Sequence, residues 1–196
     1  MKKLVAATFV VDALVIALVA YLFRQPFVPD RYTLILAFLW PIVFSFHVME
    51  EFIFPGKGEE WFRLYRPEFA SRYTETYFVK VNAIGAAAAA LVPLGIFDYR
   101  GSYSSAGIYA NLVFASAMLF NAYYHVRGTI ETKRYSPGAV TGVVLYLPLA
   151  MALYAHLLAS GAIGGLAAIL CLIVGSQLQR ILDSTHRHAL RKAAHS

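Results

Sequence analysis

Long apolar stretches separated by short polar connections dominate the pattern of this chain. A helix needs about 20 mostly apolar residues to cross the hydrocarbon of a bilayer. Six stretches reach roughly that length, and each predicts a membrane-spanning helix: residues 4–23, 33–54, 78–97, 107–125, 139–159 and 162–181. We therefore expect an all-α protein, built as an integral membrane bundle of about six transmembrane helices.

The connections carry the residues that end helices. Pro26 separates the first two stretches, and Pro55 followed by Gly56 ends the second. Ser160 and Gly161 divide the last 43 residues of apolar sequence, 139–181, which would be far too long for one membrane helix. We expect residues 1–182 to form one transmembrane domain and residues 183–196 to form a basic, histidine-rich cytoplasmic tail.

The composition supports a membrane location. Hydrophobic residues make up 59% of the chain and charged residues 14%, whereas soluble proteins carry roughly 25% charged residues. The lipid bilayer is therefore the first expected partner. The single cysteine excludes a disulfide within one chain, and nothing in the sequence sets an oligomeric state.

The distribution of Lys and Arg predicts the orientation. With a cytoplasmic N-terminus, only Arg24, Arg31 and Arg100 fall on the opposite side, and the other 14 of the 17 basic residues fall on the cytoplasmic side. Because basic residues favour cytoplasmic segments, this asymmetry predicts six spans with both termini in the cytoplasm, in a plasma (inner) membrane. It also accounts for the net charge of +6, so nucleic acid is not an expected partner.

Three ionisable residues interrupt the apolar stretch 33–54. They are His47, Glu50 and Glu51, which occupy positions i, i+3 and i+4 of the predicted helix. Such spacing places all three on one face of the helix. Ionisable side chains inside a membrane cost at least about 2.5–3.5 kcal/mol each near the centre, and they therefore indicate function by default.

Polar residues of three other predicted helices reach the same depth. Asn121 and His125, spaced i and i+4, end the stretch 107–125 on the cytoplasmic side, and Arg127 follows them. Asn82 and Thr141 lie near the beginnings of the stretches 78–97 and 139–159 on that side. The predicted topology thus brings the polar residues of four helices to one level, which indicates a cytoplasm-facing site.

Imidazole and carboxylate groups at such a site suit a transition metal. In this interpretation His47, Glu51 and His125 bind a divalent metal, zinc or iron, and Glu50 is the general base that acts on bound water. The residues expected to bind substrate or to support the ligands are Asn82, Asn121, Arg127 and Thr141. Haem held between His47 and His125 is a less favoured cofactor.

Other interpretations of the cluster stay open at this point. The carboxylate pair can serve metal-free acid–base catalysis on a lipid or another hydrophobic small molecule. A small transporter or proton relay can use His47, Glu50 and His125 as titrating groups. A structural network can pair the carboxylates with Arg127, Lys80 or Arg134. Two further ionisable residues, Asp12 and His156, lie away from the cluster, and the sequence assigns them no role.

Two blocks of the chain resemble a known family. The segment His47-Val-Met-Glu50-Glu51 is similar to the signature of HXXEE-domain proteins, which are small multi-pass membrane proteins. The later block of that family is similar to Asn121 with His125, to Arg134-Tyr135-Ser136-Pro137-Gly138, and to Thr141 and Pro148. The resemblance covers roughly residues 38–148. It implies a membrane location and a set of site residues, and it implies no reaction.

Overall fold

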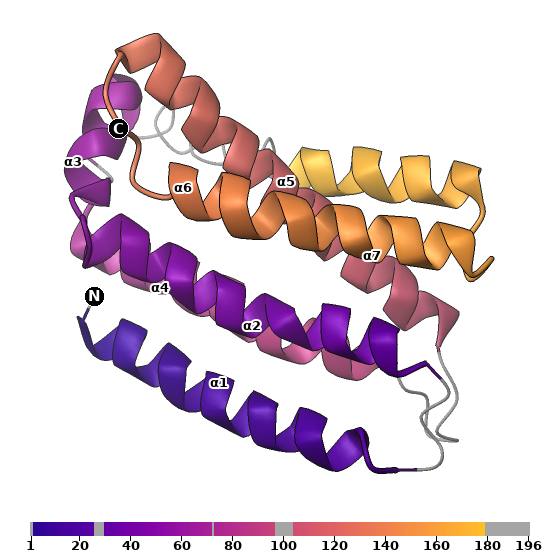
Figure 1. The fold of residues 1–196 in the computed structure, drawn as a ribbon. Helices are drawn as coiled ribbons and strands as arrows, with labels where there is room; N and C mark the ends of the chain where they lie inside the picture. Colours follow the sequence, from indigo (N-terminus) through magenta and orange to yellow (C-terminus); the bar gives the residue numbers. More distant parts are fainter. Residues whose placement is uncertain (1, 26–29, 72, 97–103, 179–196) are drawn as a thin grey trace, which may run out of the picture.

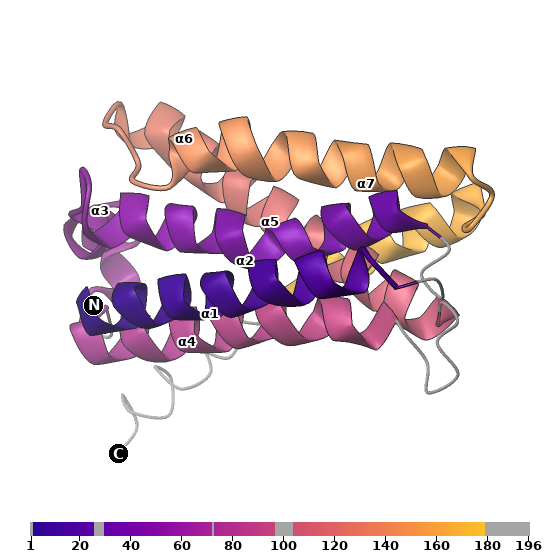
Figure 2. The ribbon, with the colours of Figure 1, turned by 60° about the horizontal axis from the view of Figure 1, so that its bottom comes forward.

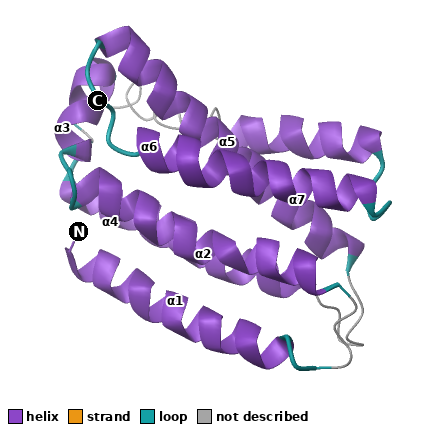
Figure 3. Cartoon of the chain, in the orientation of Figure 1, coloured by secondary structure: helices purple, strands orange, loops and turns teal. Residues whose placement is uncertain are grey.

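The computed structural model describes residues 2–25, 30–71, 73–96 and 104–178. Within these ranges all regular secondary structure is helical, which confirms the predicted all-α class (Figures 1 and 3). The α-helices are α1 (Lys2–Leu22), α2 (Arg31–Phe52), α3 (Gly58–Tyr65), α4 (Glu75–Leu91), α5 (Ser105–Thr132), α6 (Ala139–Thr141) and α7 (Leu147–Ala159). A further apolar helix, Gly165–Leu178, follows α7 and is drawn in yellow in Figure 1.

Short helical segments of other types extend the long helices. The 3-10 turns are η1 (Pro67–Phe69) after α3 and η2 (Val92–Ile96), which continues α4. A π-helical segment, η3 (Gly142–Tyr146), joins α6 to α7, so that residues 139–159 form one continuous helix. Insertions of π-helix into α-helices occur frequently at functional sites.

Polar caps fix where the long helices begin. The Asp30 side chain accepts hydrogen bonds from the backbone N–H groups of Tyr32 and Thr33 at the start of α2. Thr74 and Ser104 cap α4 and α5 in the same way. Each cap satisfies N–H groups that have no partner inside the helix. The caps therefore add local signals to the apolar pattern that defines the helices.

Five helices are long and apolar enough to cross a membrane, and they suggest a membrane protein. They are Lys2–Leu22, Arg31–Phe52, Glu75–Ile96, Ser105–Thr132 and Ala139–Ala159. The sixth predicted stretch corresponds to the shorter helix Gly165–Leu178, so the count of six spans stays a prediction. The chain turns at Ser160 and Gly161, between α7 and this helix.

The long helices run side by side in an antiparallel bundle (Figures 1 and 2). Trp40 of α2, Leu112 of α5, Tyr146 of η3 and Leu153 of α7 are fully buried in its main core. The C-terminal end of α2, the helix α3 and the start of α6 lie at the end of the bundle where α1 begins (Figure 1). This end contains the residues that the sequence analysis singles out.

Candidate functional site

Three potential metal ligands converge between α2 and α5. His47 and Glu51 lie one turn apart near the end of α2, and His125 lies on α5. Glu51 Oε1 is 3.5 Å from His47 Nε2 and 3.0 Å from His125 Nε2. The three ligand atoms all lie within 4.8 Å of one another. All three residues are buried, with exposed fractions of 3%, 4% and 0%.

Hydroxyl groups hold the other nitrogen of each imidazole. His47 Nδ1 lies 2.8 Å from Thr141 Oγ1, and His125 Nδ1 lies 2.8 Å from Ser136 Oγ. The Thr141 hydroxyl donates to the carbonyl oxygen of Gly138, so it accepts from the Nδ1–H group of His47. This tautomer leaves the His47 Nε2 lone pair free. Metal-binding histidines are oriented in this way by a partner of the second ring nitrogen.

The convergence fits a metal ion better than a closed hydrogen-bond network. Neither Nε2 atom makes a hydrogen bond of acceptable geometry with any described residue, although both are buried. Two ligands bound about 2.0–2.1 Å from a tetrahedral zinc lie about 3.3–3.4 Å apart. The two separations that involve Glu51, 3.0 and 3.5 Å, bracket that value, and the separation of the two histidine nitrogens is within 4.8 Å. Two imidazoles and one carboxylate are a donor set used by zinc enzymes and by non-haem iron enzymes.

Glu50 faces a different part of the structure from Glu51. Its Oε1 atom accepts hydrogen bonds from the backbone N–H groups of Gly138 (2.9 Å) and Val140 (3.1 Å), and also from the Tyr135 hydroxyl. Its Oε2 atom accepts from the N–H group of Thr141 at 2.7 Å. The carboxylate therefore caps the N-terminus of the helix 139–159 from a neighbouring helix. Four donors occupy its oxygens, so Glu50 interacts with the segment 135–141 rather than with the ligand set.

Tyr135 lies in the connection between α5 and α6 and completes this cap. Burial and the nearby Glu50 carboxylate raise the pKa of the Tyr135 hydroxyl above its usual value. The hydroxyl therefore stays protonated at neutral pH, and it donates to Glu50.

The helix α3 covers the site at its outer end. Trp61 of α3 stacks on the His125 ring with a centroid distance of 5.6 Å, and Phe62 meets the same ring edge-on at 5.7 Å. Gly128 of α5 provides the space for this contact, because a Cβ there would lie 2.3 Å from the Trp61 ring. These aromatic rings cover the ligand set at this end of the bundle.

An apolar cavity of about 290 Å³ opens beside the ligands. His47 and Glu51 line it together with residues of α2, α3, α4, α5 and η3. Polar groups near the ligands include Asn82, Asn121 and the Tyr146 hydroxyl. Pockets of this kind, largely apolar with a few placed polar groups, are typical of sites for small hydrophobic ligands.

One family matches the chain, over residues 38–153, and it is described as "Protein of unknown function with HXXEE motif". The chain belongs to this family. The match runs from within α2 to within α7 and includes every residue of the ligand set, and it confirms the resemblance found in the sequence. Searches of curated proteins and of solved structures found no match.

The structure places most of the predicted site residues of this HXXEE protein around the cavity. Asn82 and Asn121 line it, and Thr141 holds the imidazole of His47. Arg127 is an exception, because its side chain is exposed and pairs with Glu131 at 2.6 Å on the surface of α5. The structure therefore does not place Arg127 beside the ligand set or in a buried ion pair with its carboxylates.

A haem between the two histidines does not fit this geometry. The His47 and His125 rings meet edge to face with centroids 5.2 Å apart, and Glu51 Oε1 lies close to both Nε2 atoms. Axial histidines approach a haem iron from opposite sides of the porphyrin plane. The two rings here are in contact, so that a porphyrin plane has no space between them.

The remaining ionisable residues lie apart from the ligand set. Asp12 is buried on α1, with Ser45 of α2 as a polar neighbour. His156 lies near the end of α7 and its Nε2 donates to Asp30 Oδ2 at 2.7 Å. The predicted tail 183–196 lies outside the described residues.

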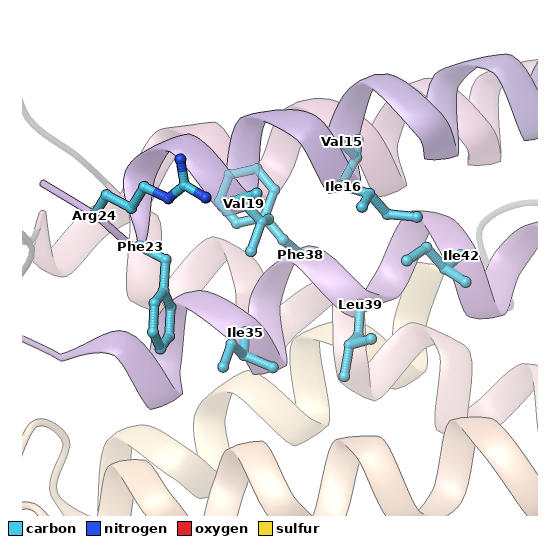
Figure 4. A pocket seen from close by; sticks show the side chains of 10 residues that line it. Val15, Ile16, Val19, Phe23, Arg24, Ile35, Phe38, Leu39 and Ile42 are labelled. Atoms are coloured by element: carbon cyan, nitrogen blue, oxygen red, sulfur yellow. The ribbon is translucent and has the colours of Figure 1, made fainter.

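A larger hollow of about 440 Å³ lies on the opposite side of α2 (Figure 4). It is lined by the apolar side chains of α1 and α2 and by Arg24, which follows α1. Among the described residues that line it, none is a potential metal ligand and none is a buried polar group without a partner. Although this hollow is the larger of the two, its lining does not support a catalytic or metal-binding site.

Tyr146, Trp61 and Ser136 complete the site, and the sequence analysis did not assign them to it. Tyr146 packs on the His47 ring with a centroid distance of 4.7 Å and is fully buried. Its position eight residues after Gly138 in the apolar stretch resembles that of an ordinary core aromatic. Ser136 was signalled only by its place in the family-like block, two residues before Gly138.

Proposed function

We propose that this HXXEE protein is a multi-pass membrane protein of the plasma (inner) membrane that uses a buried metal ion to act on a hydrophobic small molecule. It has six spans and both termini in the cytoplasm, and its site lies near the cytoplasmic face. The Lys and Arg distribution supports this orientation. The five apolar helices support the membrane location.

One observation carries the enzymatic proposal. The Nε2 atoms of His47 and His125 and the Oε1 atom of Glu51 converge at the wall of an apolar cavity, and both nitrogens lack hydrogen bonds to described residues. Three protein ligands leave coordination positions available to substrate or water, which is the arrangement of catalytic rather than structural zinc. A metal held there supplies Lewis acidity or redox chemistry, according to whether it is zinc or iron.

The residues around the ligand set would have separate roles. Thr141 and Ser136 orient the two imidazoles, and Glu50 fixes the segment that carries both hydroxyls. The aromatic rings of α3 keep water out at the aqueous end. Asn82 and Asn121 present amide groups to a molecule in the cavity. The geometry thus supports metal-centred chemistry without a separate carboxylate base.

Metal analysis of the purified full-length protein tests the proposal. After incubation with zinc or ferrous iron and removal of free metal, we expect about one metal atom per chain. His125→Ala and Glu51→Gln should lose that metal, because each removes one of three ligands. His156→Ala is the matched control, since it removes another histidine–carboxylate contact and should keep the metal. A wild-type protein that binds no metal, or variants that all bind it equally, would reject the metal site.

A second experiment separates an enzyme from the alternatives. Metal-loaded and metal-stripped protein are incubated with a membrane lipid extract, and the products are compared by mass spectrometry. Conversion that needs both metal and His125 supports the enzyme. Proton-linked uptake into vesicles without conversion would instead favour the proton relay. A purely structural network predicts that Glu51→Gln lowers the melting temperature while metal changes nothing.

A further inference from the structure

The cavity beside the ligands is elongated along the helix axes. On α4 its wall is a stripe at helical spacing that includes Val81, Gly85 and Ala88. On α5 the wall runs from Phe114 to Tyr124, which spans about 15 Å at 1.5 Å per residue. Since both helices cross the bilayer in the proposed topology, the long axis of the cavity runs parallel to the acyl chains of the surrounding lipids.

The two helix walls close at the end away from the ligands. There α5 approaches η2 so closely that a Cβ at Gly107 would lie 1.8 Å from the carbonyl oxygen of Gly95. The lining of the cavity also includes exposed apolar side chains, because Ile84 of α4 is 71% exposed and Leu178 is 42% exposed. These exposed apolar side chains face the hydrocarbon of the bilayer in the proposed topology, so the cavity is open to lipid from the side.

The polar groups of the cavity gather at its ligand end. The Tyr146 hydroxyl is fully buried and has no hydrogen-bond partner among the described residues. The Oδ1 atom of Asn121 is buried and equally without a partner there. Both residues line the cavity with His47 and Glu51. A buried donor and a buried acceptor without partners each cost free energy, which a bound polar group would recover.

We propose that the cavity binds a single-chain amphiphile, with its hydrocarbon chain between α4 and α5 and its polar head at Tyr146 and Asn121, next to the metal ligands. The molecule enters sideways from the bilayer, where its chain already lies in the required direction. In this arrangement the metal ligands and the polar head of the amphiphile lie at the same depth in the bilayer. The inference rests on the proposed function for the reaction at the head, and chain binding itself needs no metal.

Binding of a fluorescent straight-chain fatty acid to the full-length protein in lipid nanodiscs tests this assignment. Ala88→Phe fills the end of the cavity away from the ligands, where the hydrocarbon chain would lie, and should weaken binding of the probe by at least about tenfold, equivalent to 1.4 kcal/mol. Ala87→Phe is the matched control, because Ala87 is the neighbouring residue, is exposed and does not line the cavity. It should bind the probe like the wild type.

Two further measurements keep the test decisive. Tyr146→Phe removes only the hydroxyl and should weaken binding of the fluorescent fatty acid while leaving the metal content unchanged. An unlabelled straight-chain fatty alcohol should displace the probe, whereas a rigid polycyclic sterol should not. Equal probe binding by Ala88→Phe and Ala87→Phe, or displacement by the sterol, would overturn the proposal. A protein that binds the probe but takes up neither zinc nor ferrous iron would reject the metal site and leave this inference standing.

Discussion

Glu50 on α2 accepts a hydrogen bond from the backbone N–H group of Gly138 at 2.9 Å, and so joins two segments that are 88 residues apart in sequence. The same carboxylate accepts from the N–H groups of Val140 and Thr141. The first turn of the helix 139–159 therefore depends on a charge from another helix rather than on a cap of its own. Gly138, the residue before that helix, supplies no side-chain cap.

This relationship predicts a structural effect for Glu50→Gln. The substitution removes the negative charge and turns an amide NH₂ group toward backbone donors, so we expect a loss of about 1–3 kcal/mol of stability. Thermal unfolding of the purified protein measures the loss. Glu131→Gln, which alters an exposed carboxylate that interacts with Arg127 and Tyr65 at the surface, is the control and should change the melting temperature much less. An unchanged melting temperature with abolished turnover would restore Glu50 as the base.

Thr141→Val is expected to weaken metal binding without removing a ligand. The substitution keeps the shape of the side chain but removes the oxygen that accepts from His47 Nδ1. Loss of such a partner typically lowers metal affinity about 10–100-fold. Competition with a chelator measures the change. Thr132→Val is the control, because it removes a threonine hydroxyl at the end of α5 that bonds only backbone groups, and it should leave the affinity unaltered.

The sequence predicts the fold well where apolar length decides the outcome. The stretch 139–159 coincides with the helix Ala139–Ala159, and the all-α class is confirmed. The stretch 107–125 ends too early, because α5 continues to Thr132. The extension is polar and lies outside the apolar pattern, but Arg127 and Glu131 support it as an i, i+4 pair. The length of an apolar stretch predicts a membrane span, but it does not predict how far the helix continues beyond the apolar residues.

The site is predicted less completely, for a geometric reason. Helical spacing and topology bring His47, Glu51 and His125 to one depth, and the structure brings their ligand atoms together. Spacing does not fix how a helix is rotated about its axis, so it could not show that Glu50 faces Gly138 while Glu51 faces His125. The cover formed by α3 likewise depends on tertiary packing that no local pattern encodes.

At the other end of the bundle, Asp30 is expected to make the folding stability depend on pH, independently of the metal site. Partial burial raises the pKa of Asp30, but hydrogen bonds from His156 and Thr33 outweigh this effect and the pKa falls below its usual value. A carboxylate with a lowered pKa in the folded state stabilises the protein fully above its unfolded pKa of about 4. That contribution is lost as the pH falls through the folded pKa.

Asp30→Asn should therefore reduce stability by at most about 1 kcal/mol at pH 6, because the amide oxygen can still cap α2 while the charge and the second acceptor oxygen, which faces His156 and Thr33, are lost. The difference between the wild type and this variant should shrink below about pH 4. Melting temperatures from pH 6 to pH 3 measure it. A difference that stays constant or grows with acid would show that the charge of Asp30 has no stabilising role.

Gly138→Ala provides the sharpest test of the packing behind the metal ligands. A Cβ at Gly138 would lie 2.7 Å from His47 Cε1 and 2.9 Å from His125 Cε1, and it would have to displace both rings. Gly161→Ala is a matched control, because Gly161 also has a positive φ of +72° but has no atom within 4 Å of the added Cβ. In both variants, alanine in the left-handed region of backbone conformation lowers stability by about 1–2 kcal/mol. Only Gly138→Ala should also lose metal affinity in the chelator competition, since ligand atoms that move apart can no longer meet at one ion. Equal metal affinity of the two variants would mean that the imidazoles are not held in place by this contact.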